Sequence, residues 1–305
     1  MAVTGFPAVP LGSRQRLEEH YGPAVRVWID TLPERLTAAG ARWNLVPNGY
    51  YDAGHASVIA TATTDQGEPL IIKAWPDPQR YARETAAVRL WYSDEAELLR
   101  ATDDDEAMAA LVMVGGKPGG VAHALDENRI VAKALHRLHQ SGRACASIGE
   151  FPSSRSYLDD EVLPRIYERA VATRLPELVL RTLPWMARRR EAAARTTLLH
   201  ADLYRENVPF SLTGGPVFID PLPMTGDACF DWAFWTIYYR VGHLTGDRFR
   251  QAVRVPGLSK EALLPWCLCI ALDGLLYYEM TDDPRLPVMT HTLSTLVRYA
   301  EGGRK

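Results

Sequence analysis

Residues 200–207, HADLYREN, contain the residue types that phosphoryl transfer requires. Asp202 could accept or orient the proton of a substrate hydroxyl, and the Asn207 amide could supply an oxygen ligand to Mg²⁺. The spacing H-x-D-x-x-x-x-N is typical of the catalytic loop of phosphoryl-transfer enzymes. A polar turn that caps a helix is the alternative, because a short motif stays a hypothesis until its structural context supports it.

A second acidic residue follows this stretch at a short distance along the chain. The apolar run 197–199 precedes His200, and the run 217–219 is predicted to be a second strand that ends at Asp220. We therefore expect Asp202, Asn207 and Asp220 to lie close together at strand ends. In that arrangement Asn207 and Asp220 would be the two protein ligands of Mg²⁺.

A lysine and a glutamate upstream could bind the nucleotide. Lys73 lies in a predicted strand, where the two-residue alternation places it on the face opposite to Ile72. Its ammonium group could bind the α- and β-phosphates, and Glu84 on a predicted helix 79–91 could hold it in an ion pair. A surface lysine and a solvated helix glutamate are the alternative, because both types are usually exposed.

The turn 48–57 is rich in small residues and ends at Ser57. Its backbone N–H groups could lie over phosphates. Because the turn lacks a G-x-G-x-x-G string, an ordinary hairpin turn is nearly as well supported.

The segment 114–120, VGGKPGG, is predicted to link two lobes. The adenine edge of the nucleotide would then bond backbone groups near Met113 and Gly115. A floppy surface loop is the alternative that composition alone leaves open.

Composition excludes several classes of protein. At 305 residues, with 47% hydrophobic and 23% charged residues, the chain is an ordinary globular enzyme in size and content. The formal net charge of −3 argues against a broad nucleic-acid-binding surface and weakly favours a cationic substrate. The four cysteines form no Cys-x-x-Cys pair, so neither a zinc site nor a disulfide framework is indicated. With no leader-like N-terminus and no apolar run long enough to cross a bilayer, we expect a cytoplasmic monomer.

The elements that must position these residues fall into two groups, which predict an α+β fold. The first group is rich in strands, with helices at 13–20, 25–39 and 79–91 and strands at 43–46, 58–63, 69–75, 96–101 and 107–114. The second is helical, at 126–140, 158–171, 175–194, 230–241, 263–280 and 290–298. Pro33 could open a separate helix, and His136 and His139 are interpreted as helix-face residues. The expected lobes are a small antiparallel-sheet N-lobe (1–113), a linker (114–120) and a larger, mainly helical C-lobe (121–305).

Several strings together resemble the aminoglycoside phosphotransferase superfamily, nearest the branch of streptomycin 6-kinases and hydroxyurea-type antibiotic kinases. The matching strings are LPERL (32–36), RW (42–43), RETAAVRLW (83–91), LLHADL (198–203), IDP (219–221) and GDACFD (226–231). The resemblance spans most of the chain and implies a two-lobed protein-kinase-like fold. It also implies ATP or GTP and Mg²⁺ as cofactors.

The same resemblance assigns roles to residues. Asp202 becomes the catalytic base, Asn207 and Asp220 the Mg²⁺ ligands, and Lys73 with Glu84 the nucleotide pair. Asp227 and Asp231 match a segment that shapes the site behind the metal ligands. The sequence departs from the pattern at Ala201, where glycine is commonest, and at 204–206 and 222–224, which border the substrate side.

The substrate side is expected in the C-terminal half. The candidates for substrate contact are Arg205, Asp231, Asp273, Tyr277 and Glu279. Asp273 lies in an otherwise apolar helix and needs a partner to offset its desolvation. It could meet a cationic group of the substrate, or it could form an internal salt bridge to a helix arginine.

These observations predict an ATP- and Mg²⁺-dependent phosphotransferase that modifies a hydroxyl of a small cationic antibiotic and so inactivates it. A metabolic kinase of a small alcohol shares the same catalytic core and stays an alternative. A non-catalytic binding protein of the same fold is disfavoured by the complete set Lys73, Asp202, Asn207 and Asp220. A protein kinase is disfavoured because no A-P-E segment follows Asp220.

Overall fold

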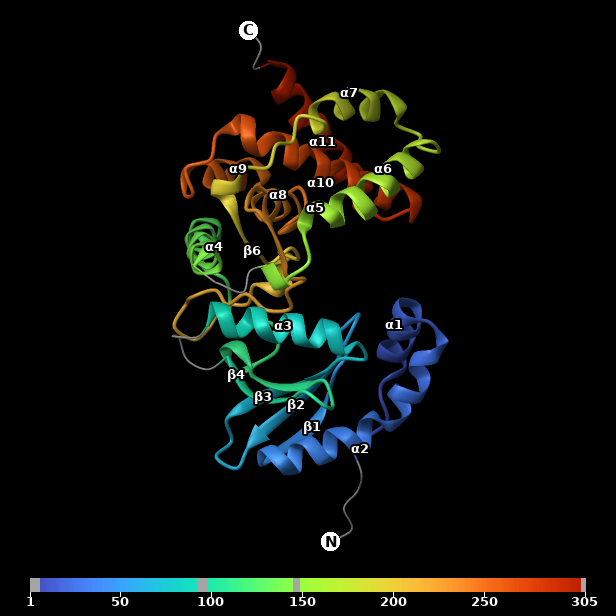
Figure 1. Ribbon diagram of the computed structural model, residues 1–305, viewed down its shortest axis with the longest axis vertical. Coiled ribbons are helices and arrows are strands. Elements are labelled where there is room, and N and C mark those ends of the chain that lie inside the picture. The colour runs from blue at the N-terminus through green and yellow to red at the C-terminus, as the bar shows by residue number, and fades with distance from the viewer. Residues whose placement is uncertain (1–5, 93–97, 145–148, 303–305) are drawn as a thin grey trace. The chain divides into compact units, whose positions relative to one another are not determined.

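The computed structural model describes residues 6–92, 98–144 and 149–302 (Figure 1). The chain divides into two compact units, residues 1–123 with 209–217 and residues 124–208 with 218–305. The predicted linker 114–120 falls inside the first unit. Both units contain strands and helices, as the α+β prediction requires.

The first unit is built on a five-stranded sheet in the order β1-β2-β3-β5-β4, with every neighbouring pair antiparallel. Its strands are β1 (Leu45–Tyr51), β2 (Val58–Thr64), β3 (Pro69–Ala74), β4 (Leu99–Asp103) and β5 (Met108–Val112). Short connections join β1, β2 and β3 in sequence order, as expected for consecutive hairpins. Ile59 lies opposite Lys73 in the register of β2 and β3, so these two side chains share one face of the sheet.

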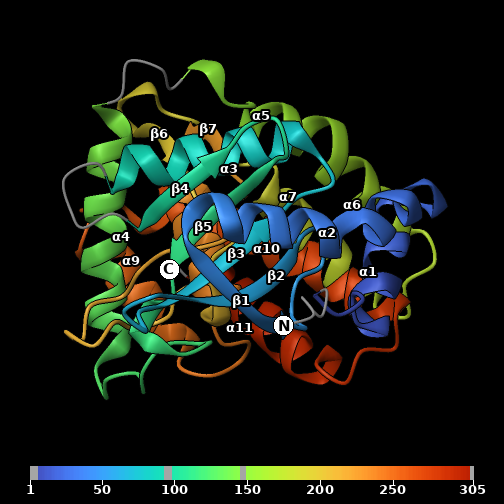
Figure 2. The same ribbon diagram turned by 90° about the horizontal axis from the view of Figure 1, so that it is seen from below.

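Two helices cover opposite faces of this sheet (Figures 1 and 2). α2 (Arg26–Trp43) buries Ile29, Leu32 and Leu36, at helical spacing, in the apolar core on one face. α3 (Pro78–Trp91) lies on the other face and begins at Asp77, whose carboxylate accepts from the Gln79 N–H. The remaining helices of this unit are α1 (Leu11–Tyr21), η1 (Pro23–Val25) and η2 (Val114–Gly116).

The helix before β1 differs from the prediction. Pro33 opens no separate helix but lies inside α2, and Trp43 ends α2 instead of starting a strand. The buried stripe continues through Leu32 and Leu36, so burial outweighs the hydrogen bond that the proline removes. Asn44, with a left-handed φ of 54°, then ends the helix and lets β1 begin at Leu45.

The second unit is mainly helical. Its elements are α4 (Glu127–Arg143), α5 (Ser154–Tyr157), η4 (Leu158–Val162), α6 (Leu163–Ala170), α7 (Pro176–Met186), η5 (Ala193–Arg195), β6 (Thr196–Leu199), η6 (Arg205–Asn207), β7 (Met224–Asp227), α8 (Cys229–Tyr238), α9 (Thr245–Arg254), α10 (Lys260–Met280) and α11 (Leu286–Gly302). α10 packs against α6, α7, α8 and α11 and is the central helix of this unit. β6 and β7 form a small antiparallel sheet.

Two predictions for this unit were wrong. The predicted helix 175–194 ends at Met186, where Arg189 donates to the Met186 carbonyl and Arg190 to the Ala187 carbonyl, which satisfies the helix end. The run 217–219 is no strand of a sheet, and the partner of β6 is β7. Within the second unit, the Ile219 N–H instead donates to the Asn207 carbonyl at 3.0 Å.

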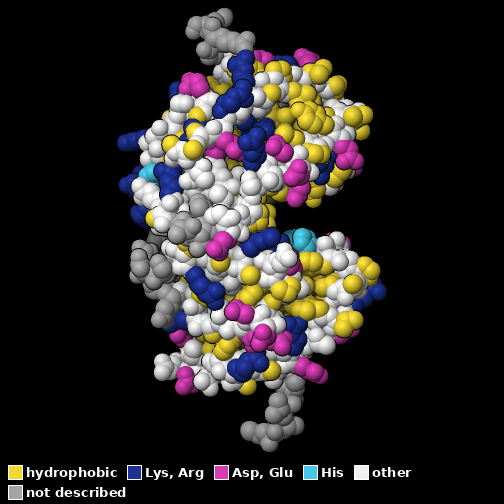
Figure 3. All heavy atoms as spheres, viewed as in Figure 1, with side chains coloured by type: hydrophobic (Ala, Val, Ile, Leu, Met, Phe, Trp, Pro, Cys, Tyr) yellow, Lys and Arg dark blue, Asp and Glu magenta, His cyan; other side chains and the backbone are white. Residues whose placement is uncertain are grey.

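The expectation that no apolar run could cross a bilayer was also too strict. α10 has 21 residues and a mean hydropathy of 1.3 in its most apolar window, enough by length and composition. Since 83% of that window is buried inside the protein, α10 has the burial of a core helix. On the face shown in Figure 3, cationic and acidic side chains are interspersed.

Candidate active site

The first unit contains the predicted lysine–glutamate pair. Lys73 and Glu84 form a salt bridge, and each residue is only 3% exposed. The second carboxylate oxygen of Glu84 accepts from Trp75 Nε1 at 2.8 Å, and the Lys73 Nζ lies 4.8 Å from the centre of the Trp75 ring. β3 and α3 therefore hold a buried ammonium group in a fixed place, whereas the alternative required both residues to be exposed. The role of this pair in nucleotide binding stays a prediction.

The segment around Met113 and Gly115 is an ordered turn. The Met113 N–H donates to the Pro69 carbonyl of β3. The Met113 carbonyl in turn accepts from the Gly116 N–H at 2.9 Å. Gly115 has a φ of 69°, and a Cβ there would lie 2.8 Å from the Val121 nitrogen. Glycine is therefore required by both backbone conformation and space. This order disfavours the alternative of a floppy loop.

In the second unit, β6 leads directly into the predicted catalytic loop. Ala201 has a φ of 59°, a left-handed conformation that is strained for a residue with a Cβ. A glycine would adopt this conformation at lower cost, which gives a physical reason for the glycine that the resemblance implies here. The strain is compensated by Asp231 of α8, which accepts from the His200 and Ala201 N–H groups, each at 2.8 Å.

Asn207 fixes the side chain of Asp202. Its amide nitrogen donates to the Asp202 carboxylate at 2.8 Å and to the Asp202 carbonyl at 2.9 Å. Because one end of the planar amide faces Asp202, the amide oxygen faces away from it, which is the orientation that a metal ligand needs. The five-residue spacing seen in the sequence thus gives a direct contact between the two side chains.

His200 connects the catalytic loop to the segment that carries Asp220. Its Nδ1 accepts from the Asp202 N–H at 3.3 Å, and its Nε2 donates to the Ile219 carbonyl at 2.9 Å. Burial lowers the pKa of His200 to about 4, so the ring is neutral at pH 7 and can make both bonds. The next residue, Asp220, has a φ of 54°, a strained conformation of the kind often found at functional sites.

The donor set fits Mg²⁺. This ion prefers hard oxygen ligands, binds through one or two side chains, and completes its shell with water and substrate phosphates. The Asn207 amide oxygen and the Asp220 carboxylate supply that number and type. Among the described residues, no group of three or more His, Cys, Asp or Glu side chains could form an all-protein metal site.

Asp231 was predicted to contact substrate, and this was wrong. Its side chain is 0% exposed, and its two oxygens accept from His200, Ala201 and His139. A carboxylate with no accessible surface holds the loop in place and leaves no face for a ligand. That Asp231 belongs to a segment behind metal ligands stays a prediction from the resemblance.

The other substrate candidates have protein partners. Asp273 accepts from Arg165 at 2.9 and 2.5 Å, so the salt bridge that the sequence left open is present. Glu279 accepts from Thr173 and from the Arg174 N–H, and Arg205 donates to Glu127 at 3.0 Å. Tyr277 is 44% exposed. Substrate binding by Asp273, Tyr277, Glu279 and Arg205 stays a prediction.

Sequence reasoning missed His139. It was interpreted as a helix-face residue but is 1% exposed, with its Nε2 2.8 Å from Asp231. The sequence contained a sign of this burial, because His139 follows Leu135 by four residues and Val131 by eight, on the buried stripe of α4. A buried polar residue on such a stripe needs a partner, and its partner here is a loop-holding carboxylate.

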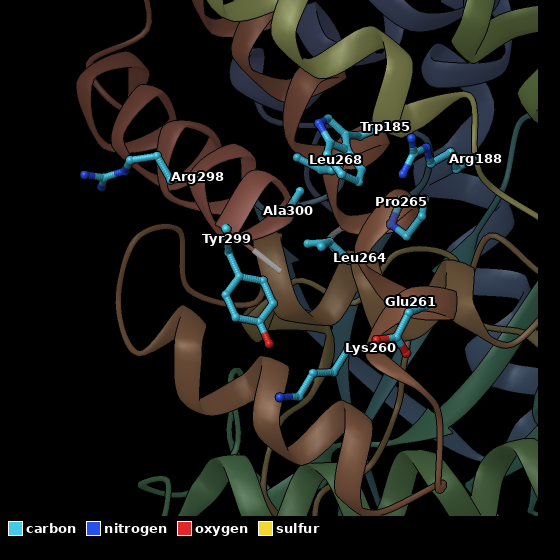
Figure 4. Close-up of a pocket in the computed structure, with 11 residues that line it drawn as sticks. Trp185, Arg188, Lys260, Glu261, Leu264, Pro265, Leu268, Arg298, Tyr299 and Ala300 are labelled. Atoms are coloured by element: carbon cyan, nitrogen blue, oxygen red, sulfur yellow. The ribbon is translucent and has the colours of Figure 1, made fainter. Parts of the chain in front are cut away.

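A cavity of about 750 Å³ opens elsewhere in the second unit, where the ends of α7, α10 and α11 meet (Figure 4). Trp185, Leu264 and Leu268 supply apolar surface, and Arg188 and Lys260 supply charge. None of the predicted catalytic or metal-binding residues is among the described residues that line it. The cavity is therefore separate from the catalytic loop.

Comparisons with known proteins place these features in a family. Residues 42–255 match the family described as aminoglycoside/hydroxyurea antibiotic resistance kinase. The streptomycin 6-kinase of Streptomyces griseus is 28% identical over 272 residues, which cover 84% of this chain and 83% of that protein.

Solved structures share the fold, as two examples show. A choline kinase from Streptococcus pneumoniae superposes with a TM-score of 0.59 at 11% identity, over 87% of this chain and 99% of that chain. A spectinomycin phosphotransferase in complex with ADP and spectinomycin superposes with a TM-score of 0.58 at 11% identity, over 88% and 98%. At such identities the likeness concerns the fold alone, and it confirms the predicted kinase-like architecture.

Proposed function

Because the chain belongs to the family of aminoglycoside/hydroxyurea antibiotic resistance kinases, we propose that it phosphorylates a hydroxyl group of a small cationic antibiotic. The phosphoryl donor is ATP or GTP with Mg²⁺. A streptomycin-like aminoglycoside is the first substrate to consider, since the similarity to a streptomycin 6-kinase covers most of both chains. The added phosphate would inactivate the antibiotic by changing its charge and shape.

The observation that carries this proposal is the contact between Asn207 and Asp202. The Asn207 amide fixes the Asp202 carboxylate, and the buried Asp231 carboxylate holds the loop that carries Asp202. A carboxylate held in this way can accept or orient one substrate proton in a defined direction. Positioning of this kind supplies much of the rate in phosphoryl transfer. Asp202 is thus the proposed base.

The nucleotide would be held by residues of the first unit. Lys73, fixed by Glu84, would bind the α- and β-phosphates, and the turn ending at Ser57 would contribute backbone N–H groups. Met113 and Gly115 would meet the adenine or guanine edge. Mg²⁺ on Asn207 and Asp220 would neutralise charge on the phosphates.

A metabolic kinase of a small alcohol is the second candidate, and one observation favours it. Asp273, the acidic residue that the sequence analysis put forward to meet a cationic antibiotic, is already paired with Arg165. Its charge is therefore partly compensated, which weakens the case for a strongly cationic substrate. If the antibiotic is the substrate, Tyr277, Glu279 and Arg205 are the other residues expected to contact it.

Phosphate transfer from ATP and from GTP should be measured against streptomycin, other aminoglycosides, hydroxyurea, choline and simple polyols. Product mass identifies a phosphorylated compound, and the Asp202→Asn variant serves as the blank. We expect turnover of an aminoglycoside that disappears in the variant. Turnover of choline or a polyol alone would favour the metabolic alternative, and transfer to none would contradict the proposal.

We propose that the enzyme acts as a monomer in the cytoplasm, where nucleotide triphosphates are available. Light scattering of the purified chain tests the first point. Fractionation of cells that express the chain tests the second.

A further inference from the structure

The loop between β1 and β2 is held by a helix that lies outside the sheet, α1 (Figure 1). Ser13 donates to the Asp52 carboxylate at 2.6 Å, and Arg16 Nε donates to the Gly54 carbonyl at 2.9 Å. Arg16 also forms an ion pair with Asp52. These bonds from Ser13 and Arg16 lower the pKa of Asp52, so the carboxylate is charged at neutral pH.

Two carbonyl groups of the loop between β1 and β2 are turned toward α1. Besides the Gly54 carbonyl, the Ala56 carbonyl accepts from the Tyr21 hydroxyl at 2.8 Å. In a planar trans peptide, the N–H of the following residue points opposite to the carbonyl. The N–H groups of His55 and Ser57 are therefore directed away from the side chains that hold the loop.

Glycines allow close approaches at this contact and within the loop. A Cβ on Gly12 would lie 2.9 Å from an Asp52 side-chain oxygen, so α1 and the loop pack closely. Inside the loop itself, a Cβ on Gly54 would lie 2.2 Å from the Ser57 carbonyl oxygen, so this turn requires glycine. On its other side α1 is anchored by Leu17, which is fully buried in the core of the first unit. The helix thus connects the loop rigidly to the sheet core.

The loop leads directly into the strand beside the buried lysine. Val58 opposes Ala74, and Ile59 opposes Lys73. We infer that α1 is a brace for this loop and that Arg16 is a positioning residue, which orients the loop N–H groups for nucleotide phosphates. The inference rests on the proposed function, because it assumes that this loop covers a nucleotide.

A braced loop binds more tightly than a free one, because the cost of ordering its backbone is met during folding and not at binding. Removing the Arg16 side chain deletes the bond to Gly54 and the pairing with Asp52. We expect a five- to tenfold rise in Kd and KM for nucleotide, about the effect of one ordinary hydrogen bond. kcat and the acceptor KM should change less than about twofold, because Arg16 touches neither reacting group.

The matched control is two residues away on the same helix. Arg14 has a similarly exposed side chain but pairs with Asp30 of α2 and not with the loop. Nucleotide binding is measured by calorimetry with MgATP and MgGTP for wild type, Arg16→Ala and Arg14→Ala. Hydrogen exchange of amides 53–57 is followed in the same proteins without nucleotide.

The expected result is weaker nucleotide binding and faster loop exchange in Arg16→Ala, with Arg14→Ala like wild type. A second pair avoids any loss of charge: Tyr21→Phe, which removes the bond to Ala56, against Tyr50→Phe, whose hydroxyl bonds Pro7. Tyr21→Phe should also weaken nucleotide binding and speed loop exchange, but by less than Arg16→Ala does.

Failure of the inference and failure of the proposed function give different results. If nucleotide affinity and loop exchange are unchanged in Arg16→Ala, or the melting temperature alone falls, the helix is only a structural contact. If wild type binds neither ATP nor GTP, the proposed function fails and the phosphate role of the loop fails with it. In that case loop exchange still reports whether α1 holds the loop.

Discussion

Asp231 and Asp273 are both aspartates of the second unit, and the sequence marked both as substrate ligands. The structure gives them different partners. Asp231 accepts from two backbone N–H groups of the catalytic loop and from His139. Asp273 accepts from the guanidinium groups of Arg165 and Arg169, at 2.5 to 3.4 Å, and so connects α10 to α6.

The difference shows how partner chemistry separates two uses of a carboxylate. Backbone N–H groups cannot move independently of the chain, so a carboxylate that binds them fixes a loop conformation. A guanidinium group ends a flexible side chain and can exchange one partner for another. Asp231 therefore determines the geometry of Asp202, whereas Asp273 could release its arginines to a ligand.

The largest effect is expected at Asp202 itself. Asp202→Asn keeps the size of the side chain but removes the proposed base, so kcat should fall by about a hundredfold or more. Nucleotide binding and melting temperature should stay near wild type. A kcat within about tenfold of wild type, a barrier change of only about 1.4 kcal/mol, would mean that the geometry held by Asp231 serves another purpose.

Asp231→Asn should combine loss of activity with loss of stability. The amide keeps one acceptor oxygen and places an NH2 group where the other oxygen was, so at least one of the three accepted hydrogen bonds is lost. This loss should cost about 3–5 kcal/mol in free energy of unfolding for a buried charged acceptor. Displacement of the loop should also lower kcat by about a hundredfold, by misplacing Asp202. Denaturant unfolding and initial rates measure the two effects on one sample.

Asp227→Asn is the matched control for this variant. Asp227 is buried four residues earlier, and its partners are Arg195 and the Ala192 and Cys229 N–H groups. It should lose stability while kcat per folded molecule falls much less. Equal losses of kcat in both variants would remove the special role of Asp231.

The sequence indicated the contact between Asp202 and Asn207, but neither the contact between His139 and Asp231 nor the direction of Asp273. The reason is physical. Asp202 and Asn207 lie five residues apart in one loop, so their spacing already implies contact. His139 and Asp231 are 92 residues apart, and only the tertiary fold brings them together. α10 is buried on nearly all sides, so its apolar pattern has no face from which the direction of Asp273 could be inferred.

The same limit explains the errors in the elements. The run 217–219 is as apolar as a strand, but backbone pairing and not composition decides strand membership. The helix break expected at Pro33 failed because the tertiary burial of Leu32 and Leu36 overrides a local preference. By contrast, β2, β3 and β5 carry the local apolar pattern of strands, and the sequence predicted all three to within two residues at each end.

Acidification should destabilise the catalytic-loop region through His200. Because burial lowers the pKa of folded His200 from 6.5 to about 4, the unfolded chain binds a proton between these values that the folded chain does not. The stability contribution of neutral His200 is thus present above pH 6.5 and is lost as pH falls toward 4. The loss should reach about 3 kcal/mol.

Unfolding free energy measured from pH 7 to 4.5 tests this expectation. His200→Asn removes the titrating ring, so its stability should fall less steeply over this range. An identical slope in His200→Asn and wild type would contradict the assigned cause.

The smallest effect, and the one that decides what the substrate side does, concerns Asp273. Asp273→Ala leaves Arg165 without its bidentate partner, and we expect a loss of about 1–3 kcal/mol in unfolding free energy. If the ion pair is only structural, the antibiotic KM should not change. If Asp273 also meets a cationic group of the antibiotic, KM should rise about tenfold or more while the nucleotide KM stays constant.

Asp282→Ala is the control, since Asp282 is 86% exposed and its arginine contact is at the surface. A second variant, Arg165→Gln, separates the two roles further. It frees Asp273 from its strongest partner, so a substrate that competes for this carboxylate should then bind more tightly, with a lower KM. If Arg165→Gln and Asp273→Ala both lower the melting temperature and leave the antibiotic KM unchanged, Asp273 joins α6 to α10 and contacts no substrate.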